Sequence, residues 1–192
     1  LALGGLTNGV TTRQMAQAYS VFPNGGVYTP SRTYTRVTQL VDGEEVVILE
    51  NESSQEAVLS GETAYYITSM LENVVSSGTG GRANLSGMHE AGKTGTTSDN
   101  YDRWFVGYTP YYTAAVWTGY PYNATISGST NPAVVLWQQV MSQVHEGLED
   151  QSFSAPSGLT SVQYCLDSGL AANEYCAMDP RGSRVSSDPV FA

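Results

Sequence analysis

Segment 90–97, Glu-Ala-Gly-Lys-Thr-Gly-Thr-Thr, constrains the fold of this chain more than any other segment. Of the 8 Lys and Arg residues, Lys93 is the only lysine, in a chain of 192 residues with a formal net charge of -10. The surrounding residues are small or β-branched, which favours an extended strand whose backbone is open to close approach. The sequence therefore predicts a functional site at Lys93.

A nucleotide-binding loop is one interpretation of this site. Residues 87–94 match the G-x-x-x-x-G-K-[ST] pattern, in which backbone amides and the lysine hold phosphates. Such a loop follows a buried strand and opens a helix whose N-terminus faces the anion. Segment 76–86 is polar and glycine-rich, and segment 95–100 has poor helix propensity. The setting argues against this interpretation, which stays open as an alternative.

The Lys-Thr-Gly element of penicillin-interacting serine acyl-transfer enzymes is the second interpretation. Gly95 would let a substrate backbone lie against the strand, while threonine hydroxyls and Lys93 would meet a substrate carboxylate. Two aromatic and β-branched runs follow, 103–109 and 112–119, with Pro110-Tyr111 between them. The three segments predict an antiparallel meander.

The ordered set of segments resembles the transpeptidase domain of bifunctional class A penicillin-binding proteins. The resemblance covers about residues 1–147 and is carried by 91–97, Asp102, 104–110, 9–11, Ala18, Tyr19, Phe22 and 24–30. It implies an α+β fold, with an antiparallel sheet flanked by helices. It further implies a partial serine β-lactamase/D,D-transpeptidase-like fold that lacks the N-terminal strands and the Ser-x-x-Lys helix.

The resemblance also implies roles for individual residues. Lys93 and Thr96 would be catalytic, because the lysine would assist proton movement and the Thr96 N–H would be one of two oxyanion donors. The implied substrate-binding residues are Thr94, Gly95, Thr97, Thr79 and Trp104. Arg82, which follows Thr79 in a glycine-rich loop, is a further candidate for a substrate contact.

The nucleophile of this family cannot come from this chain. The family places its serine in Ser-x-x-Lys, but the residue three positions before the only lysine is Glu90. Ser98-Asp99-Asn100 spells the Ser-x-Asn element of the family, yet it follows the Lys93 strand instead of preceding it, so we interpret it as a turn. We expect the serine to come from the N-terminal remainder of the same protein or from a separate chain, and this chain alone to be inactive.

The remaining local signals predict helices and one hairpin. Thr11 or Thr12, Ser60 and Asn131-Pro132 are helix starts. Asp42-Gly43 predicts a hairpin between two β-branched runs. The side predicted to be buried in the last helix comprises Val134, Trp137, Val140, Met141 and Val144.

The chain divides by composition near Glu149, where Ser, Pro and Gly become frequent. We interpret 1–148 as the C-terminal part of a transpeptidase domain and 149–192 as a linker and a cysteine-containing tail. Cys165 and Cys176, eleven positions apart, would form a disulfide outside the cytoplasm, although free thiols remain an alternative. No metal site is predicted, because zinc needs four ligands and no histidine lies near.

The negative charge argues against nucleic acid, which requires a basic face. Neither a signal segment nor a membrane-length apolar run is present. By resemblance the protein would be a peptidoglycan D,D-transpeptidase at the extracytoplasmic face of the bacterial membrane, anchored outside this chain and without a cofactor. Its partners would be stem peptides and β-lactams. A non-catalytic module that binds the wall or a protein through the acidic surface or the tail is the alternative.

Overall fold

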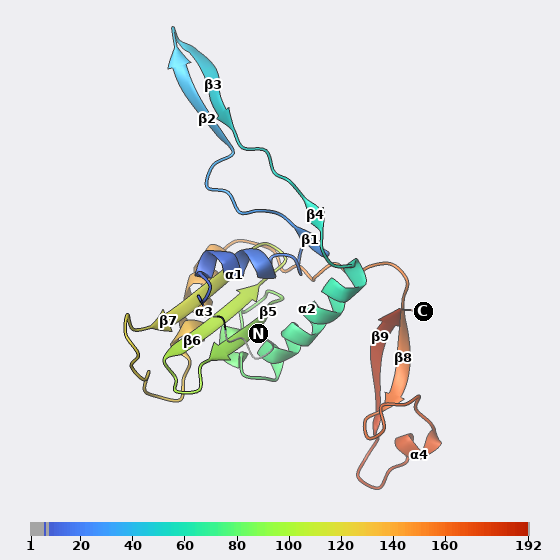
Figure 1. The fold of residues 1–192 in the computed structure, drawn as a ribbon. Helices are drawn as coiled ribbons and strands as arrows, with labels where there is room; N and C mark the ends of the chain where they lie inside the picture. The colour runs from blue at the N-terminus through green and yellow to red at the C-terminus, as the bar shows by residue number, and fades with distance from the viewer. Residues whose placement is uncertain (1–5, 7, 192) are drawn as a thin grey trace. The chain divides into compact units, whose positions relative to one another are not determined.

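The computed structural model describes residues 6 and 8–191. These residues form two compact units, the first ending at Ser154 and the second beginning at Ala155. The first unit is a mixture of helices and antiparallel strands (Figure 1). Its helices are α1 (Thr12–Tyr19), α2 (Gly61–Ser76) and α3 (Pro132–Val144), with a short 3-10 turn, η1 (Gly81–Ala83). The α+β class expected from the sequence is confirmed.

A three-stranded antiparallel sheet is the centre of the first unit. Its strands are β5 (Ala91–Thr96), β6 (Asp102–Tyr108) and β7 (Thr113–Gly119), in the order β5-β6-β7. This sheet is the meander that the sequence predicts, and β5 lies at its edge (Figure 1). In the register, Lys93 is opposite Val106 and Thr94 is opposite Phe105.

One face of the sheet packs on α3. Phe105 and Trp137 are both fully buried, and their rings meet edge to face with centroids 5.2 Å apart. Gly92 and Gly107, which are opposite each other in the register, leave the space that these rings need. A Cβ at Gly92 would lie 2.5 Å from Phe105, and one at Gly107 would lie 2.7 Å from the same ring. Larger residues at these positions would therefore force the sheet away from α3.

The opposite face of the sheet packs on α1 and α2. Tyr108 is fully buried, and its hydroxyl group lies 3.0 Å from the Thr68 hydroxyl of α2. The Tyr108 ring also contacts Phe22, just after α1, and Phe153. Burial raises the pKa of the Tyr108 phenol, so it stays neutral. The sheet is thus covered by helices on both faces.

The predicted helix starts are confirmed by their caps. The Thr11 side chain accepts from the backbone N–H of Gln14, which completes a capping box. Ser60 accepts from Thr63 N–H at the start of α2. Asn131 accepts from Ala133 N–H, with Pro132 in the first turn of α3.

The predicted buried side of α3 is only partly correct. Val134, Trp137 and Met141 are buried, but Val140 and Val144 are 47% and 45% exposed. The buried side is completed by Ala133, which the prediction omitted. The sheet covers only the side of α3 that carries Trp137. Val140 and Val144 lie beside that side of the helix and therefore remain exposed.

The Asp42-Gly43 hairpin is confirmed. Strands β2 (Arg36–Val41) and β3 (Glu44–Glu50) pair antiparallel around these two residues, whose φ angles are 54° and 86°. Two positive φ values in succession are typical of the turn in a two-residue hairpin. A small ladder of β1 (Val27–Tyr28) with β4 (Glu56–Ala57) joins the hairpin to the rest of the unit (Figure 1).

The second unit is a two-stranded ribbon. Strand β8 (Leu159–Cys165) pairs antiparallel with β9 (Val185–Phe191), and the short helix α4 (Glu174–Ala177) lies between them in the chain. Asp167 forms ion pairs with Arg181 and Arg184, and the hydrogen bond from Arg184 is the main reason why the pKa of Asp167 is lowered. These contacts stabilise the connection between the strands.

We predict that Trp137→Ala lowers the free energy of unfolding by about 3 to 5 kcal/mol, because it leaves a large cavity beneath Phe105. Leu136→Ala is the control, since Leu136 is the preceding residue of the same helix and is 46% exposed. Its expected effect is within about 0.5 kcal/mol. Denaturant unfolding of both variants measures the difference, and equal effects would show that α3 does not pack on the sheet through Trp137.

Candidate active site at the sheet edge

Lys93 lies in the middle of the edge strand β5 and is exposed. Its Nζ atom donates a hydrogen bond to the carbonyl oxygen of Thr94 at 3.1 Å, which holds the ammonium group beside its own strand. Lys93 and Thr94 are both strand residues, whereas a phosphate loop requires them to begin a helix. The nucleotide-binding interpretation is therefore wrong.

Alternation along β5 places the candidate residues on two sides of the strand. Thr94 is opposite Phe105, which packs on α3, so Thr94 and Thr96 face the α3 side. Lys93 and Gly95 face the other side, which α1 and α2 cover. The lysine and the two threonines therefore project from opposite sides of the strand.

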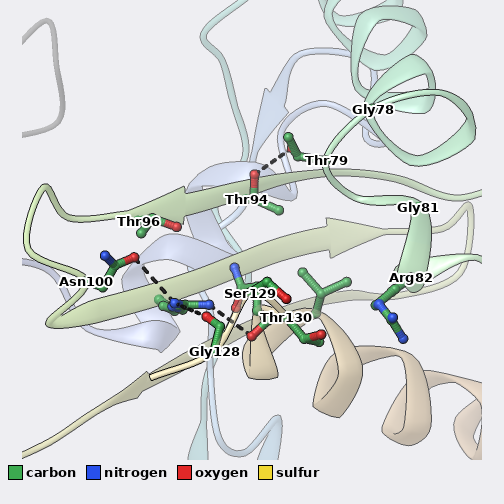
Figure 2. Close-up of a pocket in the computed structure, with 13 residues that line it drawn as sticks. Gly78, Thr79, Gly81, Arg82, Thr94, Thr96, Asn100, Gly128, Ser129 and Thr130 are labelled. Carbon is green, nitrogen blue, oxygen red and sulfur yellow. Dashed lines mark hydrogen bonds between the residues drawn. The ribbon is translucent and has the colours of Figure 1, made fainter. Parts of the chain in front are cut away.

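A pocket of about 750 Å³ opens on the α3 side of β5 (Figure 2). Thr79, Arg82, Thr94 and Thr96 line it, so the structure brings together four of the residues singled out from the sequence. The hydroxyl groups of Thr79 and Thr94 lie 2.8 Å apart and face each other in Figure 2. The other lining residues are Gly78, Gly81, Asn100, Arg103, Gly128, Ser129, Thr130, Asn131 and Val134.

Besides Lys93, three further candidates lie outside this pocket. The hydroxyl group of Thr97 accepts a hydrogen bond from Asp102 N–H and so closes the turn between β5 and β6. Trp104 is opposite Gly95 in the register and shares the Lys93 side of the sheet. A Cβ at Gly95 would lie 3.2 Å from the Cβ of Trp104, so a larger residue there would press on the tryptophan. Gly95 and Trp104 thus form one surface beside Lys93.

The polar segment after Thr97 is the turn that the sequence predicts. Asn100 has a φ of 56° and donates its N–H to Thr97 C=O at 2.9 Å. The Ser98-Asp99-Asn100 triplet therefore serves the connection from β5 to β6. Its Asn100 nevertheless lines the pocket, which the sequence did not indicate.

Arg103 and segment 128–130 are pocket residues that sequence reasoning missed. A signal existed, because alternation places Arg103 on the same side of β6 as the buried Phe105. A buried cation requires nearby hydrogen-bond acceptors. The acceptors lie more than twenty positions away in the chain, in a segment that no local pattern connects to β6.

A buried carboxyl group precedes the edge strand. Glu90 is 8% exposed; its Oε1 accepts from Asn84 Nδ2 at 2.9 Å, and its Oε2 has no hydrogen-bond partner. Burial raises the pKa of this carboxyl group. The neighbouring His89 is exposed, and its Nδ1 lies 3.4 Å from Glu72. Within residues 6 and 8–191, no group of three His, Cys, Asp or Glu residues could hold a metal ion.

Comparison with known proteins defines the class of this chain. Residues 2–128 match the penicillin binding protein transpeptidase domain. The chain is 40% identical over 190 residues to penicillin-binding protein 1A of Clostridium botulinum, covering 98% of this chain and 23% of that protein. It is 39% identical over 139 residues to penicillin-binding protein 4 of Bacillus subtilis, covering 71% and 22% of the two chains. The chain belongs to the penicillin-binding protein transpeptidase family.

Solved structures agree with this assignment. The D,D-transpeptidase domain of a peptidoglycan glycosyltransferase from Eggerthella lenta matches with a TM-score of 0.59 and 26% identity, over 71% of this chain and 32% of that chain. Penicillin-binding protein 1A from Haemophilus influenzae shares the fold, with a TM-score of 0.74 at 20% identity over 93% and 32% of the chains. The chain thus spans less than a quarter of these curated relatives and about a third of the solved chains. The fold and the relatives give no support to a non-catalytic binding module.

We predict that Glu90→Gln stabilises the protein at neutral pH by about 1 kcal/mol, because it removes a poorly paired buried charge. A carboxyl group whose pKa is higher in the folded state binds its proton more tightly there, so stability falls as the pH rises through the folded pKa. The gain should therefore shrink as the pH approaches 4. Thermal unfolding across this range measures it.

Glu62→Gln is the matched control for this experiment. Hydrogen bonds with its own backbone N–H and with Ser60 at the start of α2 lower the pKa of Glu62. The stability that this carboxylate contributes is present above its unfolded pKa and is lost as the pH falls through the folded pKa. Glu62→Gln should thus destabilise the protein at neutral pH, and the same sign for both variants would contradict our interpretation of Glu90.

Proposed function

We propose that this chain is the C-terminal part of a peptidoglycan D,D-transpeptidase domain, which cross-links stem peptides by serine acyl transfer. The observation that carries the proposal is the position of Lys-Thr-Gly-Thr on the exposed edge of an antiparallel sheet, beside a pocket of hydroxyl and guanidinium groups. Membership in the transpeptidase family supports it.

The reaction requires a serine from outside this chain. That serine attacks the carbonyl carbon between the two terminal D-Ala residues of a stem peptide and forms an acyl-enzyme, with release of the last D-Ala. An amine of a neighbouring stem peptide then attacks the acyl-enzyme and restores the serine. β-Lactams acylate the same serine. The chain alone is therefore inactive.

Residues on the two sides of β5 would have different roles in the reaction. Lys93 is exposed on the side shared with Trp104, where its ammonium group assists proton movement to and from the serine. The hydroxyl groups of Thr94 and Thr96 face the pocket and bind the carboxylate of the substrate. Thr96 N–H is one of two oxyanion donors, a contribution typically worth about 3 kcal/mol. Gly95 keeps the edge open to the substrate backbone.

The proposed setting is the extracytoplasmic face of the bacterial cell membrane. The partners would be peptidoglycan stem peptides, β-lactams and the polypeptide that carries the serine. In the described part of the chain, no helix has the length and apolar character needed to cross a bilayer.

We also propose that residues 1–148 belong to the transpeptidase domain and that 149–192 form a linker and a separate tail. The boundary between the two compact units, at Ser154 and Ala155, supports a division in this region. Phe153 packs against Tyr108, so the first part of the linker adheres to the domain.

We predict that Lys93→Ala lowers the acylation rate of the full-length protein by fluorescent penicillin about 10²- to 10³-fold, because it removes the ammonium group proposed to assist proton movement. Arg36→Ala is the control, since it also removes one positive charge, from the exposed β2–β3 hairpin. It should leave acylation unchanged. Equal rates for the Lys93 variant and the parent would refute the proposed role of Lys93. Penicillin labelling of this chain alone would refute the proposal that the serine lies outside it.

A disulfide between Cys165 and Cys176 is proposed for the tail. The structure contains both as free thiols whose side chains are in contact, and this contact lowers the pKa of Cys165 and raises that of Cys176. An extracytoplasmic oxidant would remove two electrons and two protons to join the sulfur atoms. The crosslink would stabilise the tail by about 2 to 3 kcal/mol.

We predict that neither Cys165 nor Cys176 reacts with an alkylating reagent in the denatured, unreduced protein from the cell envelope, as read by mass spectrometry of the peptides that contain them. After treatment with a reductant, both should be alkylated. In the Cys165→Ser variant, Cys176 should be alkylated under both conditions, since it loses its partner. Alkylation of both cysteines in the unreduced protein would rule out the disulfide.

A further inference from the structure

Arg103 is a buried cation that connects β6 with a distant loop. It is 6% exposed and lies opposite Thr96 in the sheet register. Its guanidinium group donates to the carbonyl oxygens of Thr130 at 2.9 Å, Gly128 at 2.7 Å and Ile126 at 3.1 Å. A longer contact of 3.4 Å reaches Asn100 Oδ1, in the turn after β5. One side chain thus holds the loop and the turn together.

The loop in question, residues 120–131, has no helix or strand of its own. Most of its residues are exposed, so no apolar core fixes its path. Besides the bonds to Arg103, it is tied to the rest of the unit by Ile126 N–H, which donates to Asn100 C=O, and by Asn131, which donates to Trp104 C=O. Three carbonyl oxygen atoms of this loop accept hydrogen bonds from Arg103. The position of Ser129 and Thr130 on the pocket wall therefore follows from this side chain (Figure 2).

Arg103 also gives the pocket its charge. Within residues 6 and 8–191 its guanidinium group forms no ion pair, and its Nε atom has no hydrogen-bond partner. Arg82 is a second guanidinium group in the lining, and no Asp or Glu lines the pocket. The chain has a net charge of -10, so the pocket is a positively charged region of a negatively charged molecule. Carbonyl dipoles satisfy the hydrogen bonds of Arg103 but do not cancel its charge.

We propose that Arg103 is a positioning residue that makes the acyl-transfer site selective for anionic ligands. It holds segment 126–130 as the wall that faces Thr94 and Thr96, and it places an uncompensated charge behind them. The position of the wall and the charge of Arg103 both strengthen the binding of a ligand with a carboxylate. Only the position of the wall strengthens the binding of a neutral ligand. This proposal rests on the proposed function, since it concerns ligands of the same site.

The test uses the full-length protein and two β-lactams, one penicillin with its free carboxylate and the same penicillin as a neutral carboxamide. For each ligand, the concentration dependence of acylation separates the apparent dissociation constant from the limiting rate. Arg103→Gln should weaken apparent binding of the anionic penicillin about 10- to 10²-fold, the range expected when a carboxylate loses a favourable interaction with a charged group. The limiting rate of acylation should change much less, and so should the apparent dissociation constant of the carboxamide.

Arg103→Lys separates charge from geometry. A lysine keeps the charge but lacks the planar set of donors that reaches several carbonyl groups at once. It should retain the preference for the anionic penicillin over the carboxamide, while amide hydrogen exchange in residues 120–131 should increase as it does in Arg103→Gln. This variant also provides a folded test if the glutamine variant does not fold. Arg36→Gln controls for the loss of a distant arginine and should match the parent in every measurement.

The outcomes are distinct. Equal losses for the anionic and neutral ligands in Arg103→Gln, or no change for either, would overturn the proposal. Loss of anion preference in Arg103→Lys, in a protein with normal hydrogen exchange in 120–131, would do the same. If the parent protein is not acylated at all, the proposed function itself fails, and the inference about Arg103 fails with it.

Discussion

The contact of Phe105 with Trp137 fixes the sheet against α3, and the geometry of the site depends on it. Phe105 is opposite Thr94 in the register, so the ring that anchors β6 also sets the position of the pocket threonines relative to α3. Val134 lines the pocket from the same helix that carries Trp137. Helix α3 thus contributes to both the core and the pocket lining. A change in its packing therefore also changes the geometry of the pocket.

The edge strand β5 presents two chemically different sides to one ligand. A substrate backbone along the free edge would meet the ammonium group of Lys93 on one side and the hydroxyl groups of Thr94 and Thr96 on the other. The separation requires no special backbone, because alternation in a strand places adjacent side chains on opposite faces. In the proposed function, proton exchange at Lys93 and anion binding at the threonines would thus lie next to each other in sequence without competing for the same space.

Two buried charged groups near β5 differ in how the protein accommodates them. Arg103 has several carbonyl partners, and its burial organises a loop. Glu90 has one unpaired oxygen atom, and burial raises its pKa. Burial with too few partners is unfavourable for a charge, whereas burial with well-placed dipoles can create a fixed field. The incomplete pairing of Glu90 favours binding of a proton, and the carbonyl dipoles around Arg103 keep a positive charge in place that suits recognition of an anion.

Most of the local structure could be predicted, because it depends on residues a few positions apart. The caps at Thr11, Ser60 and Asn131, the Asp42-Gly43 turn and the meander around Lys93 are of this kind. The Lys93 strand and the family resemblance likewise required only neighbouring residues in order. Four pocket residues, Thr79, Arg82, Thr94 and Thr96, were recognised on the same basis.

Long-range packing alone decided the rest. Which side of β5 each candidate meets depends on the register with β6 and on the contact between Phe105 and Trp137. Val140 is exposed because the sheet covers only one side of α3. The path of segment 126–130 depends on carbonyl groups that meet Arg103 from more than twenty positions away. A side chain's neighbours along the chain define what it can bond to, but only the folded backbone brings the distant partner within reach.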